Sequence, residues 1–306
     1  MNYKHTMTYK DFCKLIKEYE VYSSVCNIFE KNDMSYETLV QRRRDVCILD
    51  IIKKIDENKF SPPGKQKWEA GWGKNLEKYK KSKDSSSLIP GYRSIDAVCR
   101  LRRTFILPNS QEFESNFYTA LNNFIAEKYF SKCSSVFEFG CGPGSNLKTI
   151  SKILPDKQLY GLDWVQPAVD SVNLLRDIDG IKTQGLLFDM FVPDYNIEVP
   201  ENSGFYTFHA LEQLGDNYME FINFVLNKKP SIVVHVEPFI EFYNDNILVD
   251  YLAIKFHQVR KYIDGYYKEL LNLERLGKLK ILKSTRIGFG SYYQDNSMCV
   301  IWKPIN

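Results

Sequence analysis

The sequence has little net charge, no paired cysteine motif and no long apolar run, and each absence excludes a class of protein. Its 306 residues include 41 Lys and Arg against 38 Asp and Glu, a formal net charge of +3. Nucleic-acid-binding domains usually present a strongly basic face, so we expect no nucleic-acid partner. The seven cysteines are scattered from Cys13 to Cys299 without a C-x-x-C pair. This distribution argues against a zinc knuckle or a disulfide framework and favours a reducing compartment.

Signals for secretion and membrane insertion are missing as well. The first residues, 1–5, lack the apolar stretch of a signal peptide, and no apolar run is long enough to span a bilayer. We therefore expect a cytoplasmic protein without a membrane partner. Hydrophobic residues make up 44% and charged residues 26% of the chain, which is ordinary for a globular protein. The length suits one large domain with an appendage, or two domains.

The most informative stretch, residues 136–146, is an apolar run that ends in three glycines at alternate positions and continues into a helical pattern. Because glycine has no Cβ, it permits the unusual dihedral angles of a tight turn and the close approach of the backbone to a ligand. The first amides of the helix then point at the ligand and favour a negative group. The stretch predicts a buried strand that turns over a small ligand and enters a helix.

The spacing of the three glycines, Gly140, Gly142 and Gly144, distinguishes between two kinds of ligand. A dinucleotide fingerprint has its third glycine three residues after the second. This sequence has Ser145 there, which disfavours a nicotinamide dehydrogenase. With Glu138 in front, the spacing becomes E-x-G-x-G-x-G, and it resembles the first motif of class I S-adenosylmethionine-dependent methyltransferases.

A second acidic residue, Asp163, ends the short apolar run 158–162 and lies 23 residues after Gly140. An acid about 20 residues past the glycine loop, at the tip of the second strand, can bind both ribose hydroxyls of an adenosine. Asp163 could instead cap the helix predicted over residues 167–176, as Asp commonly does. The glycine loop upstream leads us to favour the ribose role, and the two motifs together predict an adenosyl cofactor.

The resemblance implies that S-adenosylmethionine is the cofactor and that S-adenosylhomocysteine is the product. It places the adenine beside Asp189 and Met190, where the acid would accept a hydrogen bond from the adenine amino group and the apolar side chain would cover the ring. A plain turn residue is an equally good interpretation of Asp189. The predicted cofactor contacts are Glu138, Gly140, Gly142, Gly144, Asn146, Asp163, Trp164, Asp189, Met190 and His209.

The second half of the chain alternates between strand-length apolar runs and helical patterns, which implies a parallel sheet covered by helices. Five such runs are found at 136–139, 159–162, 185–188, 205–208 and 232–236, and a long helical stretch follows at about 246–276. The last two runs, 279–287 and 298–302, are joined by a short link and so predict an antiparallel hairpin. This order resembles the class I methyltransferase sheet. We therefore expect an α/β, Rossmann-like methyltransferase sheet of five parallel strands plus a C-terminal antiparallel hairpin, in a domain covering residues 131–306.

Residues 1–130 are absent from the minimal methyltransferase unit, and we interpret them as an N-terminal helical cap that contributes substrate contacts. Apolar residues recur at helical spacing through residues 1–60 and again through 112–130. Trp68 and Trp72 lie four residues apart on one helical face. They either pack this helix onto the main domain or form a wall of the substrate cleft.

Four polar side chains near the ends of the fourth and fifth predicted strands, or on the helix that follows, are candidate catalytic residues. They are His209, Glu212, Glu237 and His257. A base near a hydroxyl or amine acceptor would remove its proton. Glu212 could instead support a helix dipole, and His235, within the fifth strand, is interpreted as a hydrogen-bonded core residue.

A divalent metal is a second possible use for these side chains, with nitrogen and carboxylate ligands from His209, His235, Glu237 and His257. Their separations match no standard metal spacing, so we expect no metal site.

Three further residues, Tyr92, Arg103 and Arg260, are candidate substrate contacts. The guanidinium fork suits phosphate or carboxylate, although a surface or ion-pair role is the plainer interpretation of each arginine. The Asn-Pro-Pro-Tyr-type motif of amino-methylating DNA enzymes is missing after the fourth strand, where the chain continues through 209–212.

The predicted function is therefore methyl transfer from S-adenosylmethionine to a small molecule, at a hydroxyl of a sugar, nucleotide-linked sugar or similar metabolite. The alternative is a scaffold or regulatory protein that binds S-adenosylmethionine or S-adenosylhomocysteine without catalysis, because fold and function separate readily. The sequence does not predict the oligomeric state.

Overall fold

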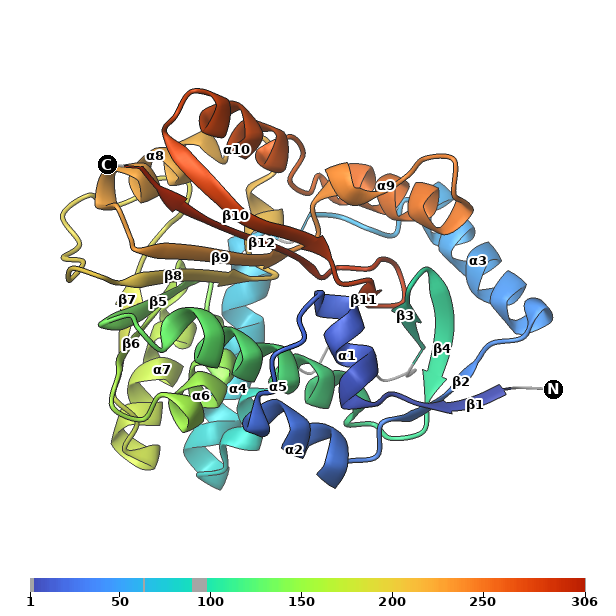
Figure 1. The fold of residues 1–306 in the computed structure, drawn as a ribbon, viewed down its shortest axis with the longest axis horizontal. Helices are drawn as coiled ribbons and strands as arrows, with labels where there is room; N and C mark the ends of the chain where they lie inside the picture. Colours follow the sequence, from blue (N-terminus) through green and yellow to red (C-terminus); the bar gives the residue numbers. More distant parts are fainter. Residues whose placement is uncertain (1–2, 63, 90–97, 306) are drawn as a thin grey trace.

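The computed structural model describes residues 3–62, 64–89 and 98–305, which form an α/β fold built on two sheets (Figure 1). The main sheet has the strand order β10-β12-β9-β8-β5-β6-β7. All four pairings among β7, β6, β5, β8 and β9 are parallel, whereas β12 pairs antiparallel with both β9 and β10, so the sheet is mixed. Its strands are β5 (Ser135–Phe139), β6 (Gln158–Asp163), β7 (Thr183–Leu187), β8 (Gly204–Phe208), β9 (Ile232–Glu237), β10 (Leu279–Arg286) and β12 (Met298–Pro304).

The central strands are buried on both faces, which explains their nearly continuous apolar sequences. Every residue of β5 and β8 is buried. Successive residues of β8 enter different cores: Phe205 packs with one hydrophobic cluster and Tyr206 with the other. Helices α8 and α10 cover the first face, and α5, α6 and α7 cover the second (Figure 1). The bounds of these helices are α5 (Phe113–Ile125), α6 (Ser145–Ile153), α7 (Gln166–Asp179), α8 (Met219–Lys228) and α10 (Tyr266–Arg275).

The long helical stretch predicted over 246–276 is two helices. Helix α9 (Leu248–Arg260) is followed by its C-cap Lys261, whose φ of 52° is left-handed. Helix α10 begins after Gly265, whose φ is 89°. A left-handed residue stops the helical hydrogen-bond pattern, so the chain turns between them. The described residues also form four short helical segments: η1 (Ser85–Leu88), η2 (Ala126–Phe130), η3 (Leu211–Leu214) and η4 (Ile240–Phe242).

The N-terminal region is not the all-helical cap predicted from its sequence, because it also contains a second sheet. This sheet has the order β1-β2-β4-β3-β11. Its strands are β1 (Tyr3–Thr6), β2 (Ser35–Thr38), β3 (Cys99–Leu101), β4 (Thr104–Pro108) and β11 (Phe289–Gly290), and the region's helices are α1 (Tyr9–Ile16), α2 (Ser23–Lys31), α3 (Gln41–Asp56) and α4 (Lys65–Ser82). Strands of two to five residues are too short to show the period-2 alternation that identifies a strand.

The two sheets are joined by the connection between β10 and β12. This connection contains β11, which belongs to the second sheet and pairs antiparallel with β3, with Phe289 opposite Leu101. One hydrophobic core also contains residues from both halves of the chain, including Phe12 of α1, Phe117 of α5 and Val136 of β5. The boundary proposed at residue 130 stays a prediction. Among the helices of the described ranges, none is both long enough and apolar enough to cross a bilayer.

Candidate cofactor and active site

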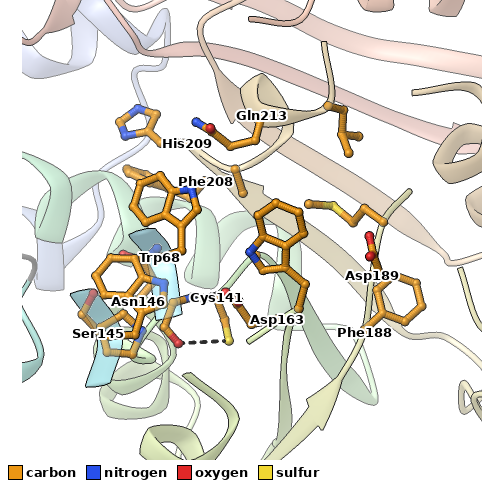
Figure 2. A pocket seen from close by; sticks show the side chains of 18 of the residues that line it. Trp68, Cys141, Ser145, Asn146, Asp163, Phe188, Asp189, Phe208, His209 and Gln213 are labelled. Atoms are coloured by element: carbon orange, nitrogen blue, oxygen red, sulfur yellow. Dashed lines mark hydrogen bonds between the residues drawn. The ribbon is translucent and has the colours of Figure 1, made fainter. Parts of the chain in front are cut away.

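A cavity opens where the parallel strands of the main sheet end. It encloses about 790 Å³ of empty space, including the part open to solvent, which is a typical volume for a small-molecule site. Its wall comes from the segments that follow β5, β6, β7 and β8, together with α4 (Figure 2). Ligands of open α/β sheets bind beyond the carboxyl ends of the strands, where the strand order reverses. In this sheet that point lies between β5 and β8.

The glycine loop forms the floor on the side of β5. Gly140, Gly142 and Gly144 all have left-handed backbones, with φ of 69°, 51° and 86°. The loop folds back on β6, since the amide of Gly140 donates to the carbonyl of Leu162 at 2.7 Å. Gly144 is the N-cap of α6, so the loop leads directly into the start of a helix, as its sequence predicts.

Asp163 is the last residue of β6 and lies in the cavity wall, 5% exposed. Its Oδ2 accepts a hydrogen bond from the amide of Gly142 at 2.9 Å, and its Oδ1 accepts one from the amide of Val165 at 3.2 Å. Helix α7 has Val165 as its N-cap and no side-chain cap, so the helix-capping role considered for Asp163 is wrong. A carboxylate has about four lone-pair positions, and two therefore remain for a ligand.

Burial makes the carboxyl of Asp163 a weaker acid than usual. Removal from water raises its pKa from 3.8 to about 6, and the backbone N–H groups of Gly142 and Val165 oppose that rise. Desolvation disfavours the charged form of a carboxyl, while hydrogen bonds to the carboxylate favour it. Asp163 therefore changes charge close to neutral pH.

Glu138 lies behind the cavity rather than in its wall. It is 1% exposed, and its Oε1 accepts a hydrogen bond at 2.7 Å from Nδ2 of Asn146, which lines the cavity. Oδ1 of Asn146 accepts from Asn122 at 3.3 Å, and Oδ1 of Asn122 accepts from the hydroxyl of Tyr206 at 2.9 Å. This buried chain fixes the orientation of the Asn146 amide at the start of α6.

Asp189 and Met190 lie in the wall beyond β7; Asp189 makes the contact of a turn residue, and its contact with adenine stays a prediction. Its Oδ1 accepts a hydrogen bond from the amide of Phe191 at 2.9 Å, as in an Asx turn, and the residue also lines the cavity. Trp164 stacks on Phe191 with ring centroids 5.8 Å apart and planes 27° apart. Together these side chains form an apolar slot with one carboxylate.

Trp68 and Trp72 of α4 line the cavity and pack this helix onto the main domain, while their use as a wall for the substrate stays a prediction. The two indoles stack with centroids 5.4 Å apart. Trp72 packs with Val165 and against the glycine loop, where a Cβ on Gly142 would lie 3.1 Å from its Cζ2. Figure 2 shows Trp68 beside Asn146 and Ser145, across the cavity from Asp189 and Phe188.

His209 follows β8 and lines the cavity in a left-handed conformation, with φ of 54°. Such a backbone is uncommon outside glycine and costs about 1 kcal/mol or more. Its amide donates to the carbonyl of Val236 at 3.0 Å, and its ring packs against Phe208 and Tyr118. Strained residues of this kind cluster at functional sites. Figure 2 shows its imidazole at the same end of the cavity as the Gln213 amide.

The other three catalytic candidates are absent from the described cavity wall. Glu237 is fully buried, and both its carboxylate oxygens lie 3.0 Å from the amide of Ala210. Burial, together with the charge of Glu212, raises the pKa of Glu237 to about 8. Burial also raises the pKa of Glu212 to about 7, although nearby Arg260 opposes the rise. Both carboxyls are thus buried in the protein and do not line the cavity, whereas His209 does.

His257 and His235 are core residues. His257 is 1% exposed between the rings of Tyr243 and Tyr262, and burial lowers its pKa to about 4. His235 is hydrogen-bonded to Thr207 at 2.9 Å and to Tyr266 at 3.1 Å, which agrees with its interpretation as a hydrogen-bonded core residue. Burial lowers its pKa to about 3.

No metal site is formed by the candidate ligands considered from the sequence. In the part of the chain that the structure describes, no three His, Cys, Asp or Glu side chains are grouped so that they could hold a metal ion.

The candidate substrate residues are dispersed. Arg103 pairs with Asp250 at 2.9 Å, away from the cavity wall. Arg260 donates to the carbonyl of Ser61 and to the hydroxyl of Tyr262. Tyr92 lies outside the described residues.

Several residues of the cavity were not singled out from the sequence. Phe188 and Phe191 flank the Asp189–Met190 pair, and the aromatic residues directly after a predicted strand were a usable signal. Gln213 follows the fourth strand by five residues. Its inward position depends on η3, which apolar periodicity does not predict.

The charge of the cavity wall is one-sided. Its described residues include two carboxylates, Asp163 and Asp189, but no lysine or arginine. Six aromatic side chains surround these acids: Trp68, Trp72, Trp164, Phe188, Phe191 and Phe208. A diphosphate normally requires cationic partners, whereas carboxylates and ring faces attract a cation.

No protein-family model matches this sequence, and no curated protein does either. Some solved structures are similar to parts of the chain. A SAM-dependent methyltransferase from Aquifex aeolicus is 15% identical with a TM-score of 0.42, over 60% of this chain and 89% of that one. The mitomycin 7-O-methyltransferase MmcR is 16% identical with a TM-score of 0.46, over 78% and 68%. The plantazolicin methyltransferase BpumL, in complex with SAH, is 14% identical with a TM-score of 0.45, over 84% and 99%. TM-scores below 0.5 carry no functional argument, so the site itself is the evidence for function.

Proposed function

We propose that this chain is an S-adenosylmethionine-dependent methyltransferase acting on a small molecule. The observation that carries the proposal is the cavity at the strand ends, with its glycine loop, two carboxylates and aromatic walls, and with no cation among its described lining residues. S-adenosylmethionine is an adenosine attached to a positively charged sulfonium and has no phosphate. The wall therefore matches this cofactor in charge and disfavours a dinucleotide.

Each part of the cofactor has a matching group in the wall. The two unused lone-pair positions of Asp163 fit the two ribose hydroxyls. Asp189 can accept a hydrogen bond from the adenine amino group, while Met190 and Phe191 supply apolar cover for the ring. Asn146, held by Glu138, lies at the start of α6 and suits the polar end of the methionine moiety.

When bound, the cofactor supplies an activated methyl group for an in-line displacement, so the protein's task is chiefly alignment. We assign the role of base to His209, because it alone of the four catalytic candidates lies in the described cavity wall. Its imidazole would accept the proton of an acceptor hydroxyl. The amide of Gln213, from the same end of the cavity, can hydrogen-bond that hydroxyl and orient it.

Groups at the same end of the cavity support a proposal for the acceptor class. A hydroxyl of a sugar, nucleotide-linked sugar or similar metabolite is the acceptor we propose. The Trp68–Trp72 stack offers a flat apolar face, and His209 and Gln213 offer polar groups. Such a combination of ring faces and a few convergent polar groups is typical of small-molecule sites.

Calorimetric titration with S-adenosylmethionine and S-adenosylhomocysteine tests the cofactor. We expect saturable binding of both, no binding of NADH, and weakening of about 100-fold in Asp163→Ala, because two hydrogen bonds to a carboxylate are lost. The matched control is Asp170→Ala, an exposed acid on α7 that bonds only Gln166 among the described residues. Tighter binding of NADH, or equal affinities in the two variants, would contradict the proposal.

Turnover is tested separately from binding. Incubation with labelled S-adenosylmethionine and a panel of hydroxylated metabolites should yield S-adenosylhomocysteine with the wild type, and at least 100-fold more slowly with His209→Gln. Retained cofactor binding without turnover on any acceptor would instead favour a non-catalytic scaffold or regulator.

A further inference from the structure

A second cavity, of about 640 Å³ of empty space, lies between the end of α1, the turn from β3 to β4, and the end of β10. It shares no lining residue with the cavity at the strand ends. Its charged lining residues are Lys14, Lys17, Arg102, Arg103, Arg286 and Asp295. We propose that this cavity binds the phosphate group of a small phosphorylated molecule.

The charge around the cavity is positive after the acids paired with its lining cations are included. Five cations and one carboxylate line it. Two further carboxylates lie against those cations: Asp250 contacts Arg103 and Arg286, and Asp11 lies 3.5 Å from Lys14. Two positive charges are therefore in excess, which matches the charge of a phosphate monoester near neutral pH.

Both terminal nitrogens of Arg286 are hydrogen-bonded to the protein. Its two terminal nitrogens donate to the carboxylate of Asp250 at 2.7 and 2.6 Å, and one also donates to Asp295 at 2.8 Å. Its remaining bond goes to the carbonyl of Phe242 at 3.2 Å. The function of Arg286 is thus to fix two buried acids, both 1% exposed or less.

Arg103 is held in place while its terminal nitrogens stay available. Its Nε donates to Asp250 at 2.9 Å, and its side chain is 42% exposed. Neither terminal nitrogen bonds another of the described residues. A guanidinium anchored through Nε presents its forked end in a fixed direction, and this fork suits phosphate oxygens.

Arg102 and Arg103 form a turn whose backbone conformation is unfavourable for residues other than glycine. Both residues are left-handed, with φ of 49° and 66°, in a two-residue hairpin loop where Asn-Gly is favoured. The turn is fixed because the amide of Arg102 donates to the carbonyl of Gly288 at 2.6 Å. Conformations of this kind persist where the surroundings impose them, and they often mark functional sites. Within the described ranges, the guanidinium of Arg102 has no ion-pair or hydrogen-bond partner.

A structural role accounts for Arg286 but not for this pair of arginines. An ion-pair network needs only the Nε of Arg103, and it makes no use of Arg102 or of the ammonium group of Lys17. These groups converge with Arg103 on one cavity. A phosphate monoester has three terminal oxygens that can accept from all three groups, and its charge of about −2 matches the two excess positive charges, whereas a carboxylate carries only one negative charge.

Calorimetric titration of the full chain with inorganic phosphate, pyrophosphate and glycerol 3-phosphate at constant ionic strength tests the proposal. We expect saturable binding with one site per chain, weakened at least tenfold in Arg102→Gln and in Arg103→Gln. Arg176→Gln is the matched control, because this arginine of α7 is 52% exposed and pairs only with Asp177 among the described residues. Its affinity should stay within twofold of the wild type.

Two comparisons complete the test. Tighter binding of glycerol 3-phosphate than of inorganic phosphate would identify an ester as the ligand, and equal affinity would identify free phosphate; either supports the site. No saturable binding, or equal losses in all three variants, would overturn it. Arg102→Gln keeps the test valid if Arg103→Gln fails to fold. S-adenosylhomocysteine affinity should be unchanged in these variants, so the outcome here is independent of the proposed methyl transfer.

Discussion

Gly140 and Ala210 face each other so closely that a Cβ added to Gly140 would lie 2.3 Å from the Cβ of Ala210. The first residue follows β5 and the second lies just beyond β8, so the two strand ends meet beneath the cavity. The glycine at this position is therefore required by contact as well as by its φ of 69°. The amide of Ala210 is itself held by Glu237.

We expect Gly140→Ala to lower the free energy of unfolding by about 3 kcal/mol, since overpacking and a left-handed alanine both cost energy. Adding Ala210→Gly removes the clashing atom, and the next contacts, with Cε of Met190 and Cα of Ala210, would be an ordinary 3.6 and 3.7 Å. The double variant should therefore regain all but about 1 kcal/mol, the cost of the left-handed backbone. Urea unfolding of the four proteins measures this cycle.

A glycine with a similar backbone conformation but no neighbouring atom at its Cβ position provides the control. Gly180 has a similar φ of 65° and nothing near its Cβ position, so Gly180→Ala should cost only the backbone term of about 1 kcal/mol. If Ala210→Gly fails to rescue Gly140→Ala, the close approach of the two strand ends is not the cause of the loss.

The cofactor affinity should depend on pH through Asp163. Because burial raises its pKa to about 6, its carboxylate is mostly protonated at pH 5 and mostly ionised at pH 7. In the proposed complex the ionised form accepts hydrogen bonds from both ribose hydroxyls, so S-adenosylhomocysteine should bind about tenfold more tightly at pH 7 than at pH 5. Titration calorimetry at intervals of half a pH unit measures the change.

Asp163→Asn separates this effect from other titrating groups. Glu212 also titrates near neutral pH, and it is present in both proteins. The variant should bind weakly and with little pH dependence in this range. An equally steep rise in the variant would show that another group controls the affinity.

The glycine loop and the strand-end acid of the cavity could be predicted from the sequence because their patterns are local. A glycine at a left-handed turn and an acid at a strand end leave their pattern within a few residues. Gly140, Gly142 and Asp163 lie in one cavity wall, and Gly144 is the N-cap of the helix that follows the loop. The predicted strands at 136–139, 159–162 and 205–208 all fall within β5, β6 and β8 for the same reason, because a buried strand is a continuous apolar run.

The catalytic side was less predictable, because it depends on which way a side chain faces. Glu237 and His257 are near the correct sheet edge in sequence, but they point into the protein interior. The second sheet was missed because its strands are short and its final strand, β11, comes from a segment about 190 residues after β3. Pairing over such a separation leaves no local pattern.

Glu237 should make the fold less stable as pH rises. Its folded pKa, about 8, is above the usual 4.5, so its stabilising contribution is complete below about pH 4.5 and is lost as pH rises through about 8. Glu237→Gln keeps an acceptor for the amide of Ala210 and does not titrate. Between pH 7 and 9 the wild type should lose about 1 kcal/mol more than this variant.

Urea unfolding at pH 7, 8 and 9 provides the comparison, and the variant should be the more stable protein at pH 9. Glu241→Gln is a useful control, since Glu241 also accepts a hydrogen bond from a backbone amide, that of Lys268, but is exposed and lies beyond β9 in η4. Parallel pH profiles for the wild type and Glu237→Gln would contradict a neutral Glu237 in the folded state.

Asp250 should be the most sensitive ionic position of the fold. Its carboxylate is fully buried and accepts hydrogen bonds from Arg286, from Arg103 and from the amide of Asn244. Removing one partner of a buried ion pair leaves an uncompensated charge, which costs about 3–5 kcal/mol. Asp250→Asn should lose that much free energy of unfolding, measured with urea.

Asp177→Asn is the control, because it breaks an exposed pair, with Asp177 57% exposed beside Arg176. It should lose less than about 1 kcal/mol. A similar loss in both variants would mean that water reaches Arg286 when Asp250 is neutralised, and that the network around this acid is not closed to solvent.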